Sequence, residues 1–134
     1  MTTLAIMAQD IDRLALALVV DGAMVKEAEW KAPPERYLET IDRTMKEWRV
    51  DQGDFSSIWV VSGPGAFTAS RASTTIANAI AFSRSIPIQA AENPSRMTLS
   101  AFISSGAFRP SAPSSGYAVP TYDRPPHITL PKRV

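Results

Sequence analysis

The stretch that decides the expected fold is Ile58-Trp-Val-Val-Ser-Gly-Pro-Gly-Ala-Phe67. Its first four residues are apolar and rich in β-forming side chains, so they predict a short strand buried in the middle of a sheet. The glycines and proline at 63–65 end this strand in a turn, after which a helix is expected from about residue 68 to 84. A strand that passes through a tight turn into a helix is typical of an α/β layer.

Three further strands are expected before this unit. Residues 4–9 and 13–20 are nearly continuous apolar runs, and Asp21-Gly22 after the second run favours a tight hairpin turn. Residues 23–30 alternate imperfectly between polar and apolar side chains, as an edge strand partly open to water does. The chain is therefore expected to open with a three-stranded meander.

Two more helices and one more strand complete the pattern. Between residues 35 and 49 the apolar side chains recur every three or four residues, which predicts an amphipathic helix, and Pro34 suits its first turn. Residues 86–90 predict a strand, and Asn93-Pro94 predicts the N-cap and first residue of a third helix that ends near residue 105. This order predicts an α/β domain with a mixed sheet and covering helices, the ribonuclease-H-like half of the actin and sugar-kinase architecture.

The composition changes toward the C-terminus. Six prolines fall between Pro110 and Pro131, and this part is too poor in apolar residues to form a core. We expect a ribonuclease-H-like domain over residues 1–92, a short helix and Pro/Ser-rich bridge over 93–116, and a tail over 117–134 that docks back on the domain. The expected docking anchors are Tyr122, Ile128 and Leu130.

Size and charge limit the classes of function. The 134 residues are 45% hydrophobic, which suits one globular domain, and the formal net charge of +1 gives no global field for nucleic acid or an anionic membrane. Cysteine is absent from the sequence, which excludes disulfides and thiolate metal sites and suits the cytoplasm. Asp10 and Asp12 interrupt the apolar start before it reaches the length of a signal sequence or a membrane span, so a soluble protein is expected.

The Gly63-Pro64-Gly65 turn is the first candidate for chemistry. A glycine turn before a helix can present backbone N–H groups to a phosphate, so a small nucleotide-binding phosphotransferase or hydrolase stays open as an alternative function. Pro64 removes one donor, and the turn lacks the spacing of the common phosphate-binding motifs. We therefore expect Gly63, Pro64 and Gly65 to form a structural turn that lets the following helix pack closely.

Metal and acid–base chemistry are not expected. Nucleotide-binding members of the actin-like superfamily place an aspartate near the end of the first strand, where this chain has Met7-Ala8-Gln9, and methionine does not hold hydrated Mg²⁺. Asp10 and Asp12 follow, but with Arg13 they look like a solvated turn. His127 is the single histidine and cannot form a His-rich metal site. We expect no catalytic, cofactor-binding or metal-binding residue.

The second helix carries the strongest functional signal. No charged side chain stands between Arg71 and Arg84, although a helix with one open face usually shows a charged stripe. We therefore expect another chain to cover it, and its small side chains let another backbone approach closely. Tyr37 and Trp48 in the first helix are of the type enriched at interfaces. The expected partner surface consists of Tyr37, Leu38, Ile41, Met45, Trp48, Arg71, Ala72, Thr75, Ile76 and Ala79.

A family resemblance covers about residues 1–92 and the C-terminal end. The segment Trp59-Val-Val-Ser-Gly-Pro-Gly-Ala-Phe-Thr-Ala-Ser-Arg71 resembles the signature of the TsaB/YeaZ family, in which an apolar strand runs into Gly-Pro-Gly-Ser-Phe-Thr-Gly-Leu-Arg and a helix. Three further segments resemble the family's first helix start, a later strand and the C-terminal end: Pro34-Glu-Arg-Tyr-Leu38, Ile86-Pro-Ile88 and Tyr122-Asp-Arg-Pro-Pro-His-Ile-Thr-Leu-Pro-Lys132.

The chain also departs from the family pattern. Ala66, Ala69 and Ser70 stand where the family has Ser, Gly and Leu. Only residues 93–116 occupy the place of the second domain that typical members have, so the chain resembles a shortened member.

The resemblance implies a non-catalytic scaffold, the dimerisation subunit of the bacterial machinery that puts threonylcarbamoyl on adenosine 37 of tRNA. It implies that the first two helices bind a TsaD-like threonylcarbamoyl transferase subunit, with the ATPase subunit of the complex as a further partner. When alone, the chain is expected to form a homodimer through the same helices. Contact with tRNA would come only through the complex, none is expected with a membrane, and no cofactor is implied.

Overall fold

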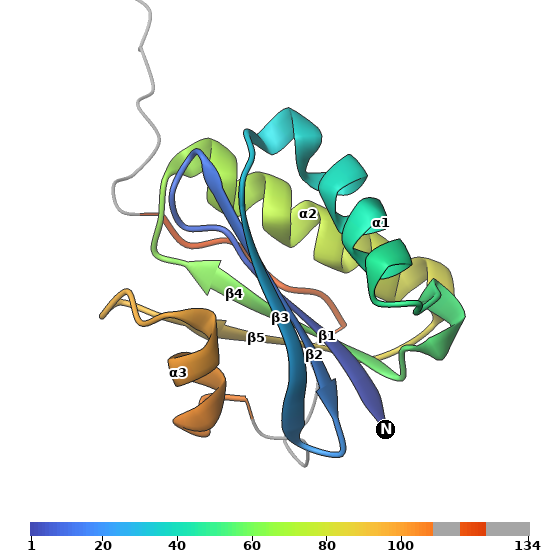
Figure 1. Cartoon of the computed structure of the whole chain (residues 1–134). Helices are drawn as coiled ribbons and strands as arrows, with labels where there is room; N and C mark the ends of the chain where they lie inside the picture. Colours follow the sequence, from blue (N-terminus) through green and yellow to red (C-terminus); the bar gives the residue numbers. More distant parts are fainter. Residues whose placement is uncertain (109–115, 123–134) are drawn as a thin grey trace, which may run out of the picture.

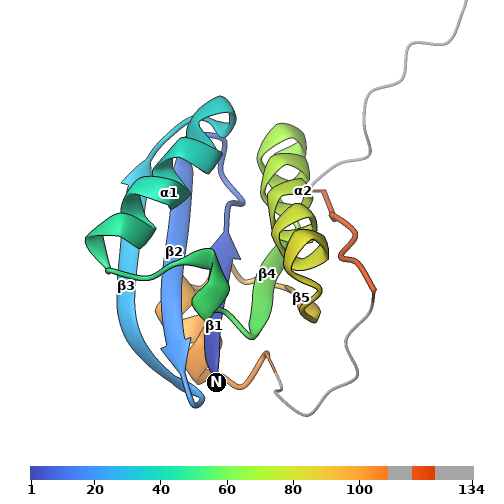
Figure 2. The ribbon, with the colours of Figure 1, turned by 90° about the vertical axis from the view of Figure 1, so that its right-hand side faces the viewer.

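Residues 1–108 and 116–122 are described by the computed structural model of this chain (Figure 1). In this part of the chain, five strands form one sheet in the order β3-β2-β1-β4-β5. The helices α1 and α2 cover one face of the sheet, and α3 covers the other (Figures 1 and 2). The elements are β1 (Thr2–Met7), β2 (Arg13–Val20), β3 (Ala23–Lys31), α1 (Tyr37–Glu47), β4 (Ser57–Gly63), α2 (Phe67–Arg84), β5 (Ile88–Glu92) and α3 (Leu99–Ser104), with short 3₁₀ helices at Pro34–Arg36 and Gln52–Asp54.

The strand β1 lies at the centre of the sheet, because it pairs antiparallel with β2 and parallel with β4. The expected meander of β1, β2 and β3 is confirmed, and β3 is the half-open edge strand. Asp21 and Gly22 both have positive φ angles, as a tight hairpin turn requires. β4 is buried along its whole length, as its apolar run predicts. The result is the expected mixed α/β sheet.

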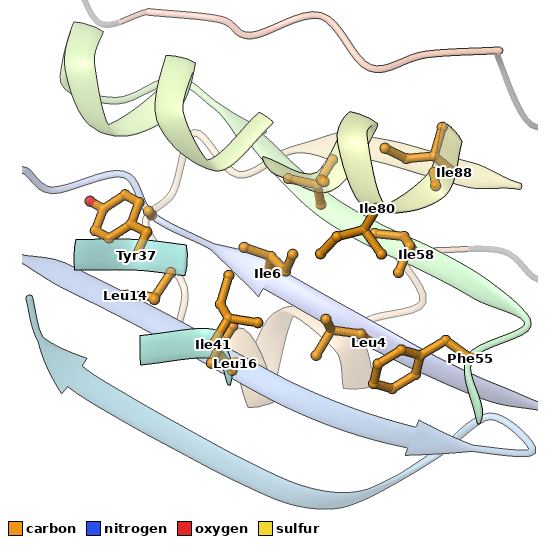
Figure 3. Close-up of a cluster of buried hydrophobic side chains, with 14 of the residues drawn as sticks. Leu4, Ile6, Leu14, Leu16, Tyr37, Ile41, Phe55, Ile58, Ile80 and Ile88 are labelled. Atoms are coloured by element: carbon orange, nitrogen blue, oxygen red, sulfur yellow. The ribbon is translucent and has the colours of Figure 1, made fainter. Parts of the chain in front are cut away.

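Two cores lie on the two faces of this sheet. Beneath α1 and α2, aliphatic residues of β1, β2 and β4 pack against the helices (Figure 3). On the other face, Trp59 stacks on Phe108 with ring centroids 4.9 Å apart, and Phe102 meets Phe108 edge-on at 5.5 Å. Because side chains alternate along a strand, Ile58 and Val60 face the helical side while Trp59 and Val61 face α3.

The third helix differs from its prediction. It begins after Thr98, whose hydroxyl accepts a hydrogen bond from the Ala101 N–H over 3.2 Å, so Thr98 is the N-cap. The prediction of Asn93 as N-cap was wrong, because the Asn93 side chain is buried and bonds to other groups. β5 also begins later than expected, since Ser85 in the left-handed conformation closes α2 and the Ile86 N–H donates to Ala81 O.

The division of the chain near residues 92 and 116 stays a prediction. Leu99, Phe102 and Phe108 lie beyond the first of these limits and contribute to the core on the second face. Residues 116–122 lie against α2. The expected anchors Ile128 and Leu130 fall outside the described residues. Among the helices of the described part, none combines the length and apolar character needed to cross a membrane.

Candidate functional site

A groove runs between α1 and α2 on the helical face of the domain. Its volume is about 590 Å³, and Ile41, Met45 and Ile80 form a floor that is almost closed to solvent. Leu38 stands on the rim with 59% of its surface exposed. The remaining lining residues are polar, three of them acidic: Glu35, Glu39, Asp42 and Gln52. The groove is therefore apolar at its base and polar at its rim, where Glu39 pairs with Arg36 and Asp42 with Lys46.

The outer side of α2 is a second open surface, on a different side of the helix from Ile80 in the groove. Arg71, Thr75, Ala79 and Phe82 recur at spacings of four, four and three residues, which puts them on one stripe of the helix, and all four are exposed. Phe82 is 87% exposed, an unusual position for a large aromatic ring. The prediction from sequence omitted Phe82, although its helical spacing from Ala79 was visible.

The structure separates the predicted partner residues into three groups. Leu38, Arg71, Thr75 and Ala79 are exposed; Trp48, Ala72 and Ile76 are half-buried against the core; Ile41 and Met45 reach the floor of the groove.

Tyr37 requires a correction, because its side chain is completely enclosed between α1 and the sheet and does not reach the surface (Figure 3). Its hydroxyl has no hydrogen-bond partner within the described residues. Burial raises the pKa of Tyr37 to about 12, and the carboxylates of Asp12 and Asp10 add to the rise. Tyr37 thus acts as a neutral core residue and supports the surface from below.

The Gly63-Pro64-Gly65 turn joins β4 to α2 and is closely surrounded. A Cβ on Gly65 would lie 2.7 Å from Gln9 Cα and from the Ser70 hydroxyl, and a Cβ on Gly63 would collide with the backbone oxygen of Thr121. The Ala66 N–H, at the start of α2, donates to Gln9 O over 2.8 Å. Both glycines are thus required by close approach of the chain to itself.

The end of β1 is tied to this turn by a buried amide network. Gln9 Nε2 donates to the carbonyl oxygens of Pro64 and Asn93, both over 2.8 Å. Asn93 Nδ2 donates to Gln9 Oε1 over 3.0 Å, and the Met97 N–H donates to Asn93 Oδ1 over 3.0 Å. The Gln9 amide therefore holds the end of β1, the turn and Asn93 together. The sequence offered no signal that would pair these two residues.

Charged residues surround a small cleft at the same end of β1. The cleft measures about 120 Å³ and is lined by Met7, Asp10, Arg13 and Arg96, among others. Asp10 pairs with Arg96 over 2.8 Å, and both side chains are partly open to solvent. Within residues 1–108 and 116–122, no three His, Cys, Asp or Glu side chains come together as a metal cluster. His127 lies outside the described residues.

The strand order, the mixed pairing and the placement of the helices define a ribonuclease-H-like domain. YeaZ from Pseudomonas aeruginosa matches it with a TM-score of 0.60 and 24% identity, over 69% of this chain and 44% of that one. A second structure from the same organism, an uncharacterised protein with similarity to peptidase YeaZ, matches with the same score and identity, over 69% of this chain and 43% of that one. The chain therefore spans less than half the length of these relatives.

The family follows from the sequence itself. The TsaD family model, described as tRNA N6-adenosine threonylcarbamoyltransferase, matches residues 29–114, and the chain belongs to this family. Together with the YeaZ-like fold, this match confirms the prediction of a short TsaB/YeaZ-like chain. No curated protein sequence matches the chain.

Proposed function

We propose that this chain is a non-catalytic subunit that supports biosynthesis of N6-threonylcarbamoyladenosine at position 37 of tRNA. It binds the threonylcarbamoyl transferase subunit through the open surface of α1 and α2, and it pairs with a second copy through the same surface when alone. The observation that carries the proposal is the exposed stripe of Arg71, Thr75, Ala79 and Phe82 on α2. The reaction in this proposal is taken from the description of the matched family, tRNA N6-adenosine threonylcarbamoyltransferase.

The shape and chemistry of this surface suit a partner helix or loop. Thr75 and Ala79 are small enough to let a second backbone approach α2 closely, and Phe82 supplies an aromatic anchor of the type that dominates interface energies.

The end of β1 supports the non-catalytic part of the proposal. Met7 stands near the strand end, and the Gln9 side chain is engaged with Pro64 and Asn93. Asp10 is paired with Arg96 at the surface. Replacement of Asp10 and Asp12 together should therefore leave the rate of reconstituted tRNA modification close to that of the parent. Loss of turnover with the complex intact would revive an enzymatic role.

The test is binding to the transferase subunit, measured by sedimentation and by titration calorimetry. Phe82→Ala should weaken the complex by roughly tenfold or more, because truncation of a buried aromatic anchor costs on the order of 1–3 kcal/mol or more. Val25→Ala is the matched control, since Val25 is an exposed apolar side chain on the edge strand β3. Equal affinities for the two variants would contradict the proposed surface. A titration with ATP and Mg²⁺ should show no tight site in the isolated chain.

A further inference from the structure

Residues 116–122 lie along α2 on the side away from α1, in an extended course from the middle of the helix to the turn before it (Figures 1 and 2). This segment is far from α2 in sequence, but it makes specific contacts at both ends. The side of α2 that faces it is therefore an occupied surface.

The first contact is made by one side chain that bonds to both main-chain groups of a single residue. Asn78 Nδ2 donates to Ala118 O over 2.8 Å, and the Ala118 N–H donates to Asn78 Oδ1 over 2.6 Å. Both backbone groups of Ala118 are thus satisfied by a single amide, as they would be by a neighbouring strand. Ala118 is buried, whereas Tyr117 and Val119 point outward and are exposed. The site therefore encloses a small residue at this point.

The second contact is at the Gly63-Pro64-Gly65 turn. The Thr121 N–H donates to Ser62 O over 2.7 Å, and the Thr121 hydroxyl donates to the same oxygen over 3.2 Å. Tyr122 forms a parallel bridge with Gly65, and its ring lies 4.7 Å from that of Phe67. The Thr121 carbonyl occupies the space that a side chain at position 63 would need. Glycine at this position therefore makes room for a peptide.

From these contacts we propose that the turn and the adjoining flank of α2 form a binding site for an extended polypeptide main chain, with residues 116–122 as its intramolecular ligand. The residues that bind the ligand are Ser62, Gly63, Phe67 and Asn78. In the ligand, the bound residues are the small Ala118 and, three and four positions later, Thr121 and Tyr122. Thr121 of this ligand fills the space beside Gly63 in the turn. The glycine motif of this chain is a peptide site.

Amide hydrogen exchange on the full chain tests this site residue by residue. The amides of Ala118 and Thr121 should be protected, since both donate to fixed acceptors. Asn78→Ala should speed exchange at Ala118 by roughly tenfold, because it removes both hydrogen bonds to that residue. Ser83→Ala, an exposed change on the same helix, is the control and should leave both rates unchanged. Gly63→Ala should also displace Thr121 from the turn. However, Gly63 has a φ of 133°, which is strained for any other residue, so the test relies on the folded Asn78→Ala variant.

Each outcome decides for or against the site. Unprotected amides at Ala118 and Thr121 in the parent chain would overturn it, and so would equal protection in the parent and in Asn78→Ala. MgATP added as a probe should leave the protection of both amides unchanged. Loss of protection on addition of MgATP would mean that the nucleotide displaces the segment, and the turn would then be a nucleotide site. None of these outcomes depends on binding to the transferase subunit.

Discussion

The side-chain amides of Gln9 and Asn93 meet at the carboxyl edge of the sheet, where Asn93 Nδ2 donates to Gln9 Oε1 over 3.0 Å. Both residues are almost completely buried. Through this pair the end of β1 is connected to the residue that follows β5, and Gln9 also reaches the turn after β4. The geometry of the turn thus depends on two residues that are 84 positions apart in the chain.

Replacement of Asn93 by alanine should destabilise the fold. It leaves Gln9 Oε1 and the Met97 N–H without their partners, and each buried polar group left unpaired costs about 1–3 kcal/mol. We expect a loss of about 2–4 kcal/mol in the free energy of unfolding, measured by urea denaturation. Ser95→Ala, at an exposed position two residues away, is the control and should change it little. A loss no larger than that of the control would show that water replaces the amide.

Gly65 should tolerate no side chain. A Cβ there would lie 2.7 Å from the backbone of Gln9, and backbone cannot move aside as cheaply as a flexible side chain. Gly65→Ala should therefore cost roughly 1–3 kcal/mol or more, seen as a lower melting temperature. Gly116→Ala places the same methyl group in open space and should leave the melting temperature nearly unchanged. Equal melting of the two variants would contradict the close packing of the turn.

An arginine at position 79 should separate copies of the chain. Ala79 is exposed on α2, and arginine is nearly as good a helix former as alanine, so the fold should persist. In a close contact between two copies, however, the new charge would be buried without a partner. We expect the parent chain to sediment as a dimer and Ala79→Arg as a monomer. Ala23→Arg, exposed at the far edge of the sheet, should remain a dimer; a dimeric Ala79→Arg would remove this stripe from the interface.

Tyr37 should make the stability depend on pH in the alkaline range. Its pKa rises from 10.0 to about 12 on folding, so the folded chain holds the hydroxyl proton more tightly than the unfolded chain does. The resulting stabilisation is complete below pH 10 and is lost as the pH rises toward 12, by up to about 3 kcal/mol. Tyr37→Phe should flatten this part of the profile in denaturation measured across the range. At neutral pH it should cost little, because the hydroxyl has no partner among the described residues.

Local sequence patterns predicted most of the secondary structure. The apolar run at 58–61 gave a central buried strand, and Asp21-Gly22 gave the hairpin, because strand burial and turn conformation follow from side chains a few residues apart. The same reasoning failed at Asn93. An asparagine before a proline is a good N-cap by local criteria, but a buried acceptor on Gln9, just after β1, was available to it in the folded chain. Local propensity yields to such long-range contacts.

The partner surface stays a prediction. The lack of charge between Arg71 and Arg84 led us to expect that another chain covers α2, and the structure shows that residues 116–122 of the same chain lie against one side of it. Hydrophobic periodicity could not separate Tyr37 from Leu38, which are neighbours in sequence. The first is enclosed and the second is open, because the direction in which α1 faces the sheet sets their burial.

By itself, the sequence determined the α/β class, the order of strands and helices, and the family, since these depend on periodicity and on motifs that are contiguous in the chain. Only the tertiary structure decided which side chains of α1 and α2 are exposed to solvent and which atoms pack against Gly63 and Gly65. It also decided which group accepts the hydrogen bond from the Asn93 side chain. The physical reason is that burial and hydrogen-bond partners are properties of contacts between distant segments. The residue type determines which hydrogen bonds and which degree of burial a side chain needs. Only the folded chain determines which distant groups provide them.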